Sequence, residues 1–324
     1  MAAGQDSPPD GVAEQLLDFV FRFRRLASTS DPCAERPCAE CFARHRDKVV
    51  GFLERGEPVH FVIPAFPAKS RSTKKVLGQL PDLGEAVAVD FLQSFCDQIS
   101  HFYPPGARIT ICSDGHVFCD LLGIPEGAVA AYRAELRRVI LATGGGSIDL
   151  YSLGDAFHTS DYGRLRELLV ARYGTPVERI RERTQQELPA RALFNGIHRF
   201  LVEDEAALRP ELSRTRVRAE CKDRAYRVIQ RSNAWSALVA DTFPDALRLS
   251  IHPQPSHSDK IGFHLIRTAD NWLTPWHGVV LDDGRRLTLV RRSDAEAMNA
   301  TVVWRNSRPS HFVAPHAYPE EFAS

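Results

Sequence analysis

The side chains best suited to chemistry stand directly after two short apolar runs that we interpret as buried strands. Lys69 and Ser70 follow the first run, and Ser113 and Asp114 follow the second. In open α/β sheets, ligands bind at the carboxyl ends of the strands. Lys69 and Ser70 could hold a phosphate or carboxylate, and the lysine could instead be an amine catalyst or a solvated loop residue. Asp114, with Ser113 beside it, could be a general base or bind a hydroxyl, although Asp–Gly is also a common turn.

A second set combines a guanidinium, a hydroxyl and an amide in the consecutive residues Arg231, Ser232 and Asn233. This set suits a carboxylate or a phosphate, which arginine can bind through two parallel hydrogen bonds. Ser232 could equally be the N-cap of a helix that begins near Ala234. The two interpretations are compatible, because helix N-termini also bind anions.

A lysine and two histidines form the third set. Lys260 and His264 lie at an even spacing in a predicted strand, so we expect both side chains on one face. His277 begins a neighbouring predicted strand. Because histidine titrates near neutral pH, we expect His264 and His277 to transfer protons with Lys260 and Asp114 nearby. The alternative is that each histidine is a buried core residue.

Cys33, Cys38, Cys41 and His45 have partial zinc-ligand character. Their spacing matches no standard zinc finger, and buried free cysteines are common, so we expect no metal and keep zinc on these residues as the alternative. The G-x-G-x-x-G, Walker A, H-E-x-x-H and G-x-S-x-G patterns are absent. We therefore expect no nucleotide, flavin or catalytic metal cofactor.

The composition narrows the classes of partner. The chain has 324 residues with 41 basic and 41 acidic side chains, so no overall positive field favours nucleic acid or an anionic membrane surface. No apolar run approaches the ~20 residues of a membrane span, and the N-terminus does not resemble a signal peptide. Seven cysteines, an odd number, fit reduced thiols. We expect a cytoplasmic protein that binds neither nucleic acid nor membrane.

The elements that must position these residues alternate between strand and helix. Buried strands are predicted at 60–64, 107–112 and 148–153, with amphipathic helices between them. This order indicates an α/β fold with a Rossmann-like mixed sheet flanked by helices, a helical insertion and additional C-terminal strands. We expect disorder at 1–11 and a single domain at 12–324, made of a helical N-terminal part at 12–55, an α/β part at 56–160, the helical insertion at 161–225 and the C-terminal strands at 226–324.

Five ordered segments resemble the isonitrile synthase family, also called the pyoverdine/dityrosine biosynthesis family. They are IPAFPAKS at 63–70, SDGHVFCDLLGIPE at 113–126, YRVIQRSNAWSALVADTFPDALRLSIHPQP at 226–255, KIGFHLI at 260–266 and WLTPWHGVVL at 272–281. The similarity runs from about residue 12 to about residue 300. Two departures are His116, where the family more often has arginine, and the cysteine cluster, which is only partly shared.

The resemblance implies a carbon–carbon lyase-type reaction of secondary metabolism without a redox cofactor. The α-amino group of an amino acid condenses with the C2 ketone of ribulose 5-phosphate. Phosphate loss and carbon–carbon cleavage then leave that one carbon on nitrogen as an isocyanide. The family implies an aromatic substrate, for which we expect tyrosine first and tryptophan second, and an iron and 2-oxoglutarate oxygenase as the partner that acts next.

This chemistry assigns provisional roles to the three sets. Asp114, His264 or His277 would move protons, and Lys69, Lys260 and Arg231 would bind the phosphate and the carboxylate. Phe66, Trp235, Trp272 and Trp276 could wall an aromatic pocket or belong to the core. Two alternatives stay open: a sugar-phosphate aldolase or transferase that uses Lys69 or Lys260 as a Schiff-base amine, and a non-catalytic amino-acid-binding protein.

Overall fold

The centre of the molecule is a five-stranded parallel sheet, described by a computed structural model that covers residues 9–157 and 159–315. The strand order is β3-β2-β1-β4-β5, and every neighbouring pair is parallel. The strands are β1 (Val59–Pro64), β2 (Ala107–Ser113), β3 (Ile148–Ser152), β4 (Leu247–Ser250) and β5 (Lys260–Gly262). The first three correspond to the predicted apolar runs. The side chains of β1 and β2 are almost all buried because helices cover both faces of the sheet, whereas β3 at the edge is only partly buried.

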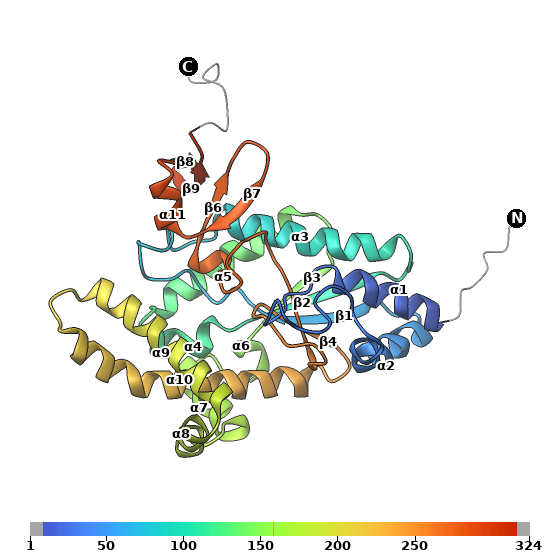
Figure 1. Ribbon diagram of the computed structural model, residues 1–324, viewed down its shortest axis with the longest axis horizontal. Helices are drawn as coiled ribbons and strands as arrows, with labels where there is room; N and C mark the ends of the chain where they lie inside the picture. The colour runs from blue at the N-terminus through green and yellow to red at the C-terminus, as the bar shows by residue number, and fades with distance from the viewer. Residues whose placement is uncertain (1–8, 158, 316–324) are drawn as a thin grey trace, which may run out of the picture.

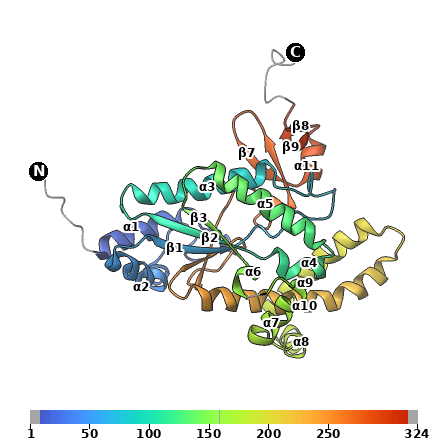
Figure 2. The same cartoon turned by 180° about the vertical axis from the view of Figure 1, so that it is seen from behind.

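Helices of the N-terminal half cover one face of the sheet, and later helices cover the other (Figures 1 and 2). The first face packs against α1 (Pro9–Phe21), α2 (Ala39–Arg55), α3 (Leu83–Ser100) and α5 (Glu126–Ala142). The second packs against α7 (Tyr162–Tyr173) and the end of α10 (Arg214–Thr242). Two short helices, α4 (Gly115–Leu122) and α6 (Leu153–Ala156), follow β2 and β3 directly. The predicted α/β fold with flanking helices is therefore confirmed.

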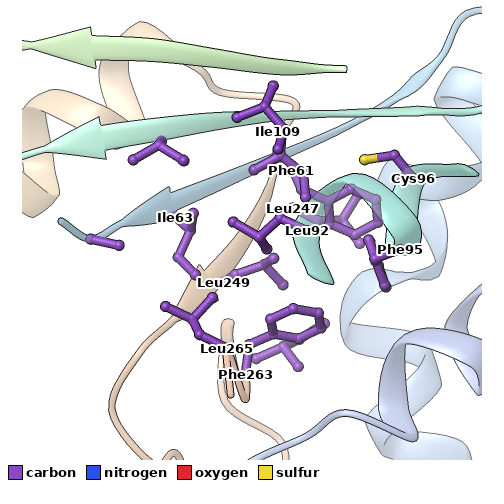
Figure 3. Packing of buried hydrophobic residues seen from close by; sticks show 14 of the residues in the cluster. Phe61, Ile63, Leu92, Phe95, Cys96, Ile109, Leu247, Leu249, Phe263 and Leu265 are labelled. Carbon is purple, nitrogen blue, oxygen red and sulfur yellow. The ribbon is translucent and has the colours of Figure 1, made fainter. Parts of the chain in front are cut away.

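The core on the first face is dense in aromatic and branched side chains (Figure 3). The strand residues Phe61, Ile63 and Leu249 lie in one cluster with the helix residue Phe95 and with Phe263. The rings of Phe61 and Phe95 lie 5.4 Å apart in an edge-to-face arrangement, as do those of Phe95 and Phe263 at 5.2 Å. These contacts join the N-terminal and C-terminal parts of the chain in one core.

The helical insertion forms an arm beside the sheet (Figure 1). It contains α7, α8 (Val177–Gln186), α9 (Leu188–Leu208) and the start of α10, with a small core of its own around Phe194, Leu201 and Val217. Helix α10 continues without interruption across residue 225, where we expected the insertion to end. The arm is therefore continuous with a helix that covers the sheet. Among the described helices, none has the length and apolar character required to span a membrane.

The additional C-terminal strands divide between two sheets. β4 and β5 extend the central sheet as parallel strands, whereas a second, four-stranded sheet has the order β7-β6-β9-β8. The strands of this second sheet are β6 (Val279–Asp282), β7 (Leu287–Val290), β8 (Thr301–Arg305) and β9 (Arg308–Val313). The 3₁₀ helix η1 (Pro275–His277) precedes β6, and the helix α11 (Arg292–Ala297) connects β7 to β8. Of the segment expected to be disordered, residues 1–8 lie outside the described residues and 9–11 belong to α1.

Candidate active site

The chain order places a topological switch point between β1 and β4. After β1 the chain adds β2 and β3 on one side, and it then returns to add β4 and β5 on the other. At such a point the segments after two neighbouring strands leave toward opposite faces, and ligands bind between them. Here these segments are 65–70 and 251–258. The candidate site therefore lies at the carboxyl ends of β1, β2 and β4.

Close backbone packing shapes this edge. A Cβ atom at Gly115 would lie 2.1 Å from the carbonyl oxygen of Pro67, so only glycine lets the β2–α4 turn meet segment 65–70. The buried Ser113 donates its hydroxyl to the carbonyl oxygen of Phe66 at 2.8 Å, and Phe66 has a left-handed φ of 56°. Ser113 therefore holds the loop after β1. The substrate contact expected for Ser113 is wrong, because its hydroxyl is committed to the backbone.

Lys69 points into the protein. Its Nζ lies 2.8 Å from carboxylate oxygens of both Asp82 and Glu85 and donates to the Pro275 carbonyl oxygen at 3.0 Å. The side chain is 0% exposed. Burial lowers the pKa of Lys69, but the charges of Glu85 and Asp82 outweigh this effect and raise it. The expected roles of Lys69 as a phosphate ligand or Schiff-base amine are wrong, because a buried and fully paired ammonium cannot reach a substrate.

Ser70 is also committed to the protein. Its hydroxyl donates to Asp204 of α9 at 3.3 Å and accepts from the Ser72 amide at 3.1 Å, and its own amide donates to the Trp276 carbonyl oxygen at 2.9 Å. The side chain is buried. The expected phosphate contact by Ser70 is therefore wrong. Lys69 and Ser70 together attach segment 272–277 and α9 to the loop after β1.

Asp114 keeps free hydrogen-bonding capacity at this edge, as does the Nε2 atom of His116 in the first turn of α4. The Oδ1 atom of Asp114 is buried and, like that Nε2, has no hydrogen-bond partner within the described part of the chain. Asp114 occupies the N-cap position of α4 without making a capping hydrogen bond. Burial of the carboxyl group raises the pKa of Asp114 to about 7. A carboxyl group that titrates near neutral pH suits general acid–base chemistry, so the position predicted for Asp114 is retained.

Two histidines lie at the same edge. His277 belongs to η1, where its Nδ1 lies 3.2 Å from the hydroxyl oxygen of Thr274 and its ring lies 4.9 Å from that of Phe200 on α9. His252 follows β4 and is exposed. Desolvation lowers the pKa of His277 to about 3, and the charges of Lys75 and His252 act in the same direction.

Sequence reasoning missed His252. The surrounding protein lowers the pKa of His252 by partial desolvation and through the charges of Arg25 and Lys260, although the residue is open to solvent on one side. The signal was available, because His252 is a polar residue just after an apolar run, as Lys69 and Asp114 are. The charge of His252 contributes to lowering the pKa of His277, which places the two histidines in one electrostatic environment.

Lys260 and His264 do not share a strand face. β5 ends at Gly262, so strand alternation does not extend to His264, and His277 lies in a 3₁₀ helix and not in a strand. The His264 side chain lines a separate cavity of about 600 Å³ with residues of the α1–α2 region, including Arg22 and Arg24. The Lys260 Nζ donates to the Ser236 hydroxyl at 2.9 Å. The expected pairing of Lys260 with His264 is therefore wrong.

Arg231, Ser232 and Asn233 lie in the middle of α10. Arg231 donates to Asp120 at 2.9 Å through Nη2 and to the Val117 carbonyl oxygen at 3.0 Å through Nη1, and so it joins α10 to α4. Ser232 and Asn233 are exposed. No helix begins at Ala234, because α10 already runs from Arg214. The expected N-cap and anion site are wrong: the guanidinium is occupied by a carboxylate of the protein itself.

The four aromatic candidates also separate into two groups. Phe66 and Trp276 are buried, and the centres of their rings lie 5.2 Å apart. Trp235 is also buried, and the centre of its ring lies 5.9 Å from that of Tyr151. Trp272 is 66% exposed, and its ring lies 5.9 Å from that of His252. Trp272 is therefore the member of this set that an aromatic ligand at the edge could contact, while the other three belong to the core.

The fourth residue that lies close to the three cysteines is a different histidine from the one predicted. Cys33, Cys38, Cys41 and His257 bring one ligand atom each to a common point, with all four atoms within 4.8 Å of one another. His45 is not in this group. It is buried on α2, and its ring lies 6.1 Å from that of Phe21. The expected ligand set is therefore corrected from His45 to His257.

Comparison with known proteins agrees with this architecture. Residues 49–303 match the family described as pyoverdine/dityrosine biosynthesis protein. An L-tryptophan isonitrile synthase of Fischerella ambigua is 48% identical over 93% of this chain and 91% of its own length. An L-tyrosine isonitrile synthase of Pseudomonas aeruginosa is 41% identical over 97% of this chain and 96% of its own length. The crystal structure of the PvcA protein from Pseudomonas aeruginosa, 41% identical, superposes with a TM-score of 0.84 and covers 93% of this chain and 99% of its own.

Proposed function

This chain belongs to the pyoverdine/dityrosine biosynthesis family of isonitrile synthases, and we propose that it converts the α-amino group of an aromatic L-amino acid to an isocyanide. The observation that carries the proposal is near-complete coverage at 48% and 41% identity by relatives that are isonitrile synthases for tryptophan and tyrosine. The polar groups at the carboxyl edge are compatible with this function, because imine chemistry requires repeated proton transfer.

We further propose ribulose 5-phosphate as the carbon donor, on the basis of the sequence resemblance. The amine adds to the C2 ketone, and water leaves to form an imine. Elimination of phosphate and cleavage of the C1–C2 and C2–C3 bonds then leave C2 on nitrogen as the isocyanide carbon. C1 leaves as formaldehyde, and C3–C5 leave as a three-carbon compound at the oxidation level of hydroxyacetone, so the overall reaction is redox-neutral. These steps need acids and bases and no added oxidant or nucleotide. We therefore propose that turnover requires no redox cofactor and no added metal.

His252 and His277 are proposed as the proton acceptors. Because their pKa values are lowered, both imidazoles are neutral at pH 7, and they can accept a proton from the substrate amine once a bound anion has raised their basicity. An anionic substrate would raise both pKa values by opposing the positive charges nearby, which makes the histidines stronger bases when substrate is bound. Asp114, titrating near pH 7, is proposed to donate the proton to the departing hydroxyl.

Lys260 is proposed to attract a substrate anion in place of Lys69. Lys75, in contrast, is paired with Asp204 and contributes only its charge beside His277. Lys260 and Lys75 both act on the histidines electrostatically. The Lys75 Nζ lies 2.6 Å from Asp204 and 4.6 Å from the centre of the Phe200 ring, next to His277. The Lys260 Nζ has one hydroxyl partner, Ser236, and keeps further donors for an incoming anion.

From the sequence we expected tyrosine as the substrate. The identities to the relatives instead favour tryptophan. Two tryptophan enzymes of Fischerella ambigua are 48% and 46% identical, whereas the tyrosine enzymes of Pseudomonas aeruginosa and Xenorhabdus nematophila are 41% and 36% identical. An iron and 2-oxoglutarate oxygenase that consumes the isocyanide stays a prediction, and so does a cytoplasmic location.

Isotope labelling tests the proposed function. The purified protein is incubated with an equimolar mixture of tryptophan and tyrosine and with ribulose 5-phosphate labelled with ¹³C at C2. The expected product is an isocyanide whose new carbon carries the label, with the tryptophan product in excess. Unlabelled isocyanide would overturn the donor, and no isocyanide from any of the twenty amino acids would overturn the function. Borohydride trapping of the sugar phosphate on Lys260 would instead support an aldolase.

A further inference from the structure

Three sulfur atoms and one imidazole nitrogen converge on a single point outside the candidate active site. The Cys38 Sγ lies 3.1 Å from the His257 Nε2 and 3.8 Å from the Cys41 Sγ, and the Cys33 Sγ lies 3.6 Å from the same Nε2. Tetrahedral zinc, with Zn–S of about 2.3 Å and Zn–N of about 2.0–2.1 Å, requires sulfur–sulfur edges of about 3.8 Å and sulfur–nitrogen edges of about 3.6 Å. The observed separations are therefore close to those of a tetrahedral site.

Hydrogen bonds hold the cysteine loop against the loop that carries the histidine. The carboxylate of Asp31 accepts from the Cys33 amide at 2.9 Å and from the Ser256 amide at 3.0 Å, so one side chain spans the two loops. Arg24 donates to the carbonyl oxygens of Cys33 and Ala34. Cys38 is the N-cap of α2 and Cys41 lies in its first turn. The ligands are thus positioned by contacts that do not involve the ligands' own side chains.

The backbone conformation of His257 and the contact of its second ring nitrogen with Glu40 also suit a metal ligand. His257 has a φ of 62°, a left-handed conformation that is unfavourable for a residue with a Cβ atom. This turn directs Nε2 toward the three sulfurs, while Nδ1 lies 3.5 Å from a carboxylate oxygen of Glu40. A carboxylate on the second ring nitrogen is the usual outer partner of a metal-bound histidine, because it selects the tautomer whose free lone pair faces the metal.

We propose that Cys33, Cys38, Cys41 and His257 bind one zinc ion. Three thiolates and one imidazole fill all four tetrahedral positions, which is the arrangement of a structural site and leaves no position for water or substrate. The soft sulfur ligands select zinc over magnesium or calcium. The site joins segment 33–41 to the loop after β4.

The zinc ion acts on the candidate active site through that loop. His257 and His252 belong to the same connection, between β4 and β5, and Lys260 begins β5. Fixing the far end of this loop restricts the positions open to His252. Zinc is therefore a positioning group for the His252 loop, and no step of the reaction passes through the metal.

Metal content gives the direct test, and it requires no substrate. The full-length chain, purified without a histidine tag from zinc-supplemented cells, is analysed for metal and sulfur by plasma mass spectrometry. We expect about one zinc per chain in the native protein and almost none in Cys38→Ser or His257→Gln. The matched controls are Cys221→Ser, a buried thiol of the helical arm, and His45→Gln, the neighbouring buried histidine, both of which keep the zinc.

Cobalt substitution keeps the proposal falsifiable if a ligand variant fails to fold. The native protein grown with Co²⁺ should show visible bands of tetrahedral cobalt and a near-ultraviolet thiolate-to-cobalt band. A native protein without stoichiometric zinc and without these cobalt bands overturns the proposal. So does a Cys38–Cys41 disulfide in protein isolated under reducing conditions, or full zinc retention by His257→Gln. None of these outcomes depends on the amino-acid substrate.

Discussion

Two charged regions of the fold differ in how completely their polar atoms are paired. In the buried ion cluster of Lys69, Asp82 and Glu85, each charge meets an opposite charge at 2.8 Å. At the reactive edge, which we define as Asp114, His252 and His277, a carboxylate oxygen has no hydrogen-bond partner among residues 9–157 and 159–315, and the surroundings hold two imidazoles neutral. Paired charges stabilise a structure, whereas groups that are desolvated without full pairing retain reactivity.

The largest effect expected from this contrast is loss of turnover at the reactive edge. His277→Gln and His252→Gln should each lower kcat by about 10²- to 10⁴-fold, the usual scale for loss of a general acid or base. The melting temperature should change little, because glutamine can keep one hydrogen bond. His264→Gln, in the separate cavity, is the matched control and should retain near-normal kcat. A large drop in melting temperature with normal kcat in His277→Gln would show that this histidine is a core residue.

The buried ion cluster should respond in stability. Lys69→Ala leaves two buried carboxylates without their cation and should lower the free energy of unfolding by about 3–5 kcal/mol. Burial already raises the pKa of Glu85 to about 7. Without the lysine, Glu85 favours its protonated form still more, so the loss of stability relative to the native protein should grow as pH rises through that value. Urea unfolding of both proteins at several pH values measures this. A selective rise in KM for the sugar phosphate, with unchanged stability, would contradict our assignment.

Replacement of Asp114 should have an effect of intermediate size, visible in how kcat depends on pH. Because the raised pKa is about 7, the protonated acid prevails below that pH, and we expect kcat to fall as pH rises above it. A carboxyl group whose pKa is raised by folding contributes stability at low pH and loses it as pH rises. Asp114→Asn should therefore remove the alkaline limb of the kcat profile and melt higher than the native protein at alkaline pH. An unchanged alkaline limb in Asp114→Asn would exclude Asp114 as the acid.

The smallest effects should come from the mid-helix residues. Ser232→Ala and Asn233→Ala change exposed side chains of α10 and should alter KM and kcat by less than about twofold. Arg231→Met should lower stability by about 1–3 kcal/mol without a preference for either substrate, since it removes hydrogen bonds from Asp120 and the Val117 carbonyl oxygen. Steady-state kinetics with each substrate varied in turn distinguishes this from the anion site that we first expected.

The sequence was sufficient to predict the parallel strands with their flanking helices and the edge of the sheet where the candidate site lies. Apolar runs ended by polar residues identified three parallel strands, and the rule that ligands bind at their carboxyl ends located Asp114. The same rule failed for Lys69 because its partners, Asp82 and Glu85, lie on a helix whose placement depends on tertiary packing. Adjacent residues give no sign of whether a side chain points outward or inward.

Distance along the chain explains the remaining errors. His45 was chosen as a metal ligand because it follows the cysteines closely, whereas His257 reaches them only after β4 joins β1. Ser232 has the chemistry of an N-cap, but a helix that begins at Arg214 continues through it. Both errors arise because local residue types describe what a side chain can do, and only the fold determines its neighbours.

The pairing of β4 with β1 also has a consequence for how the chain folds. β1 enters the sheet early in the sequence, yet its second neighbour is synthesised only after the whole helical arm. Until then, one edge of β1 offers unpaired backbone amides and carbonyls, which are a template for association with other chains. Such long-range parallel pairing is slow, because the loop must close before its contacts form. His252 and His277 come after that pairing in the sequence, so catalytic competence should be among the last properties that a newly made chain acquires, and fragments that end before β4 should aggregate and not retain partial activity.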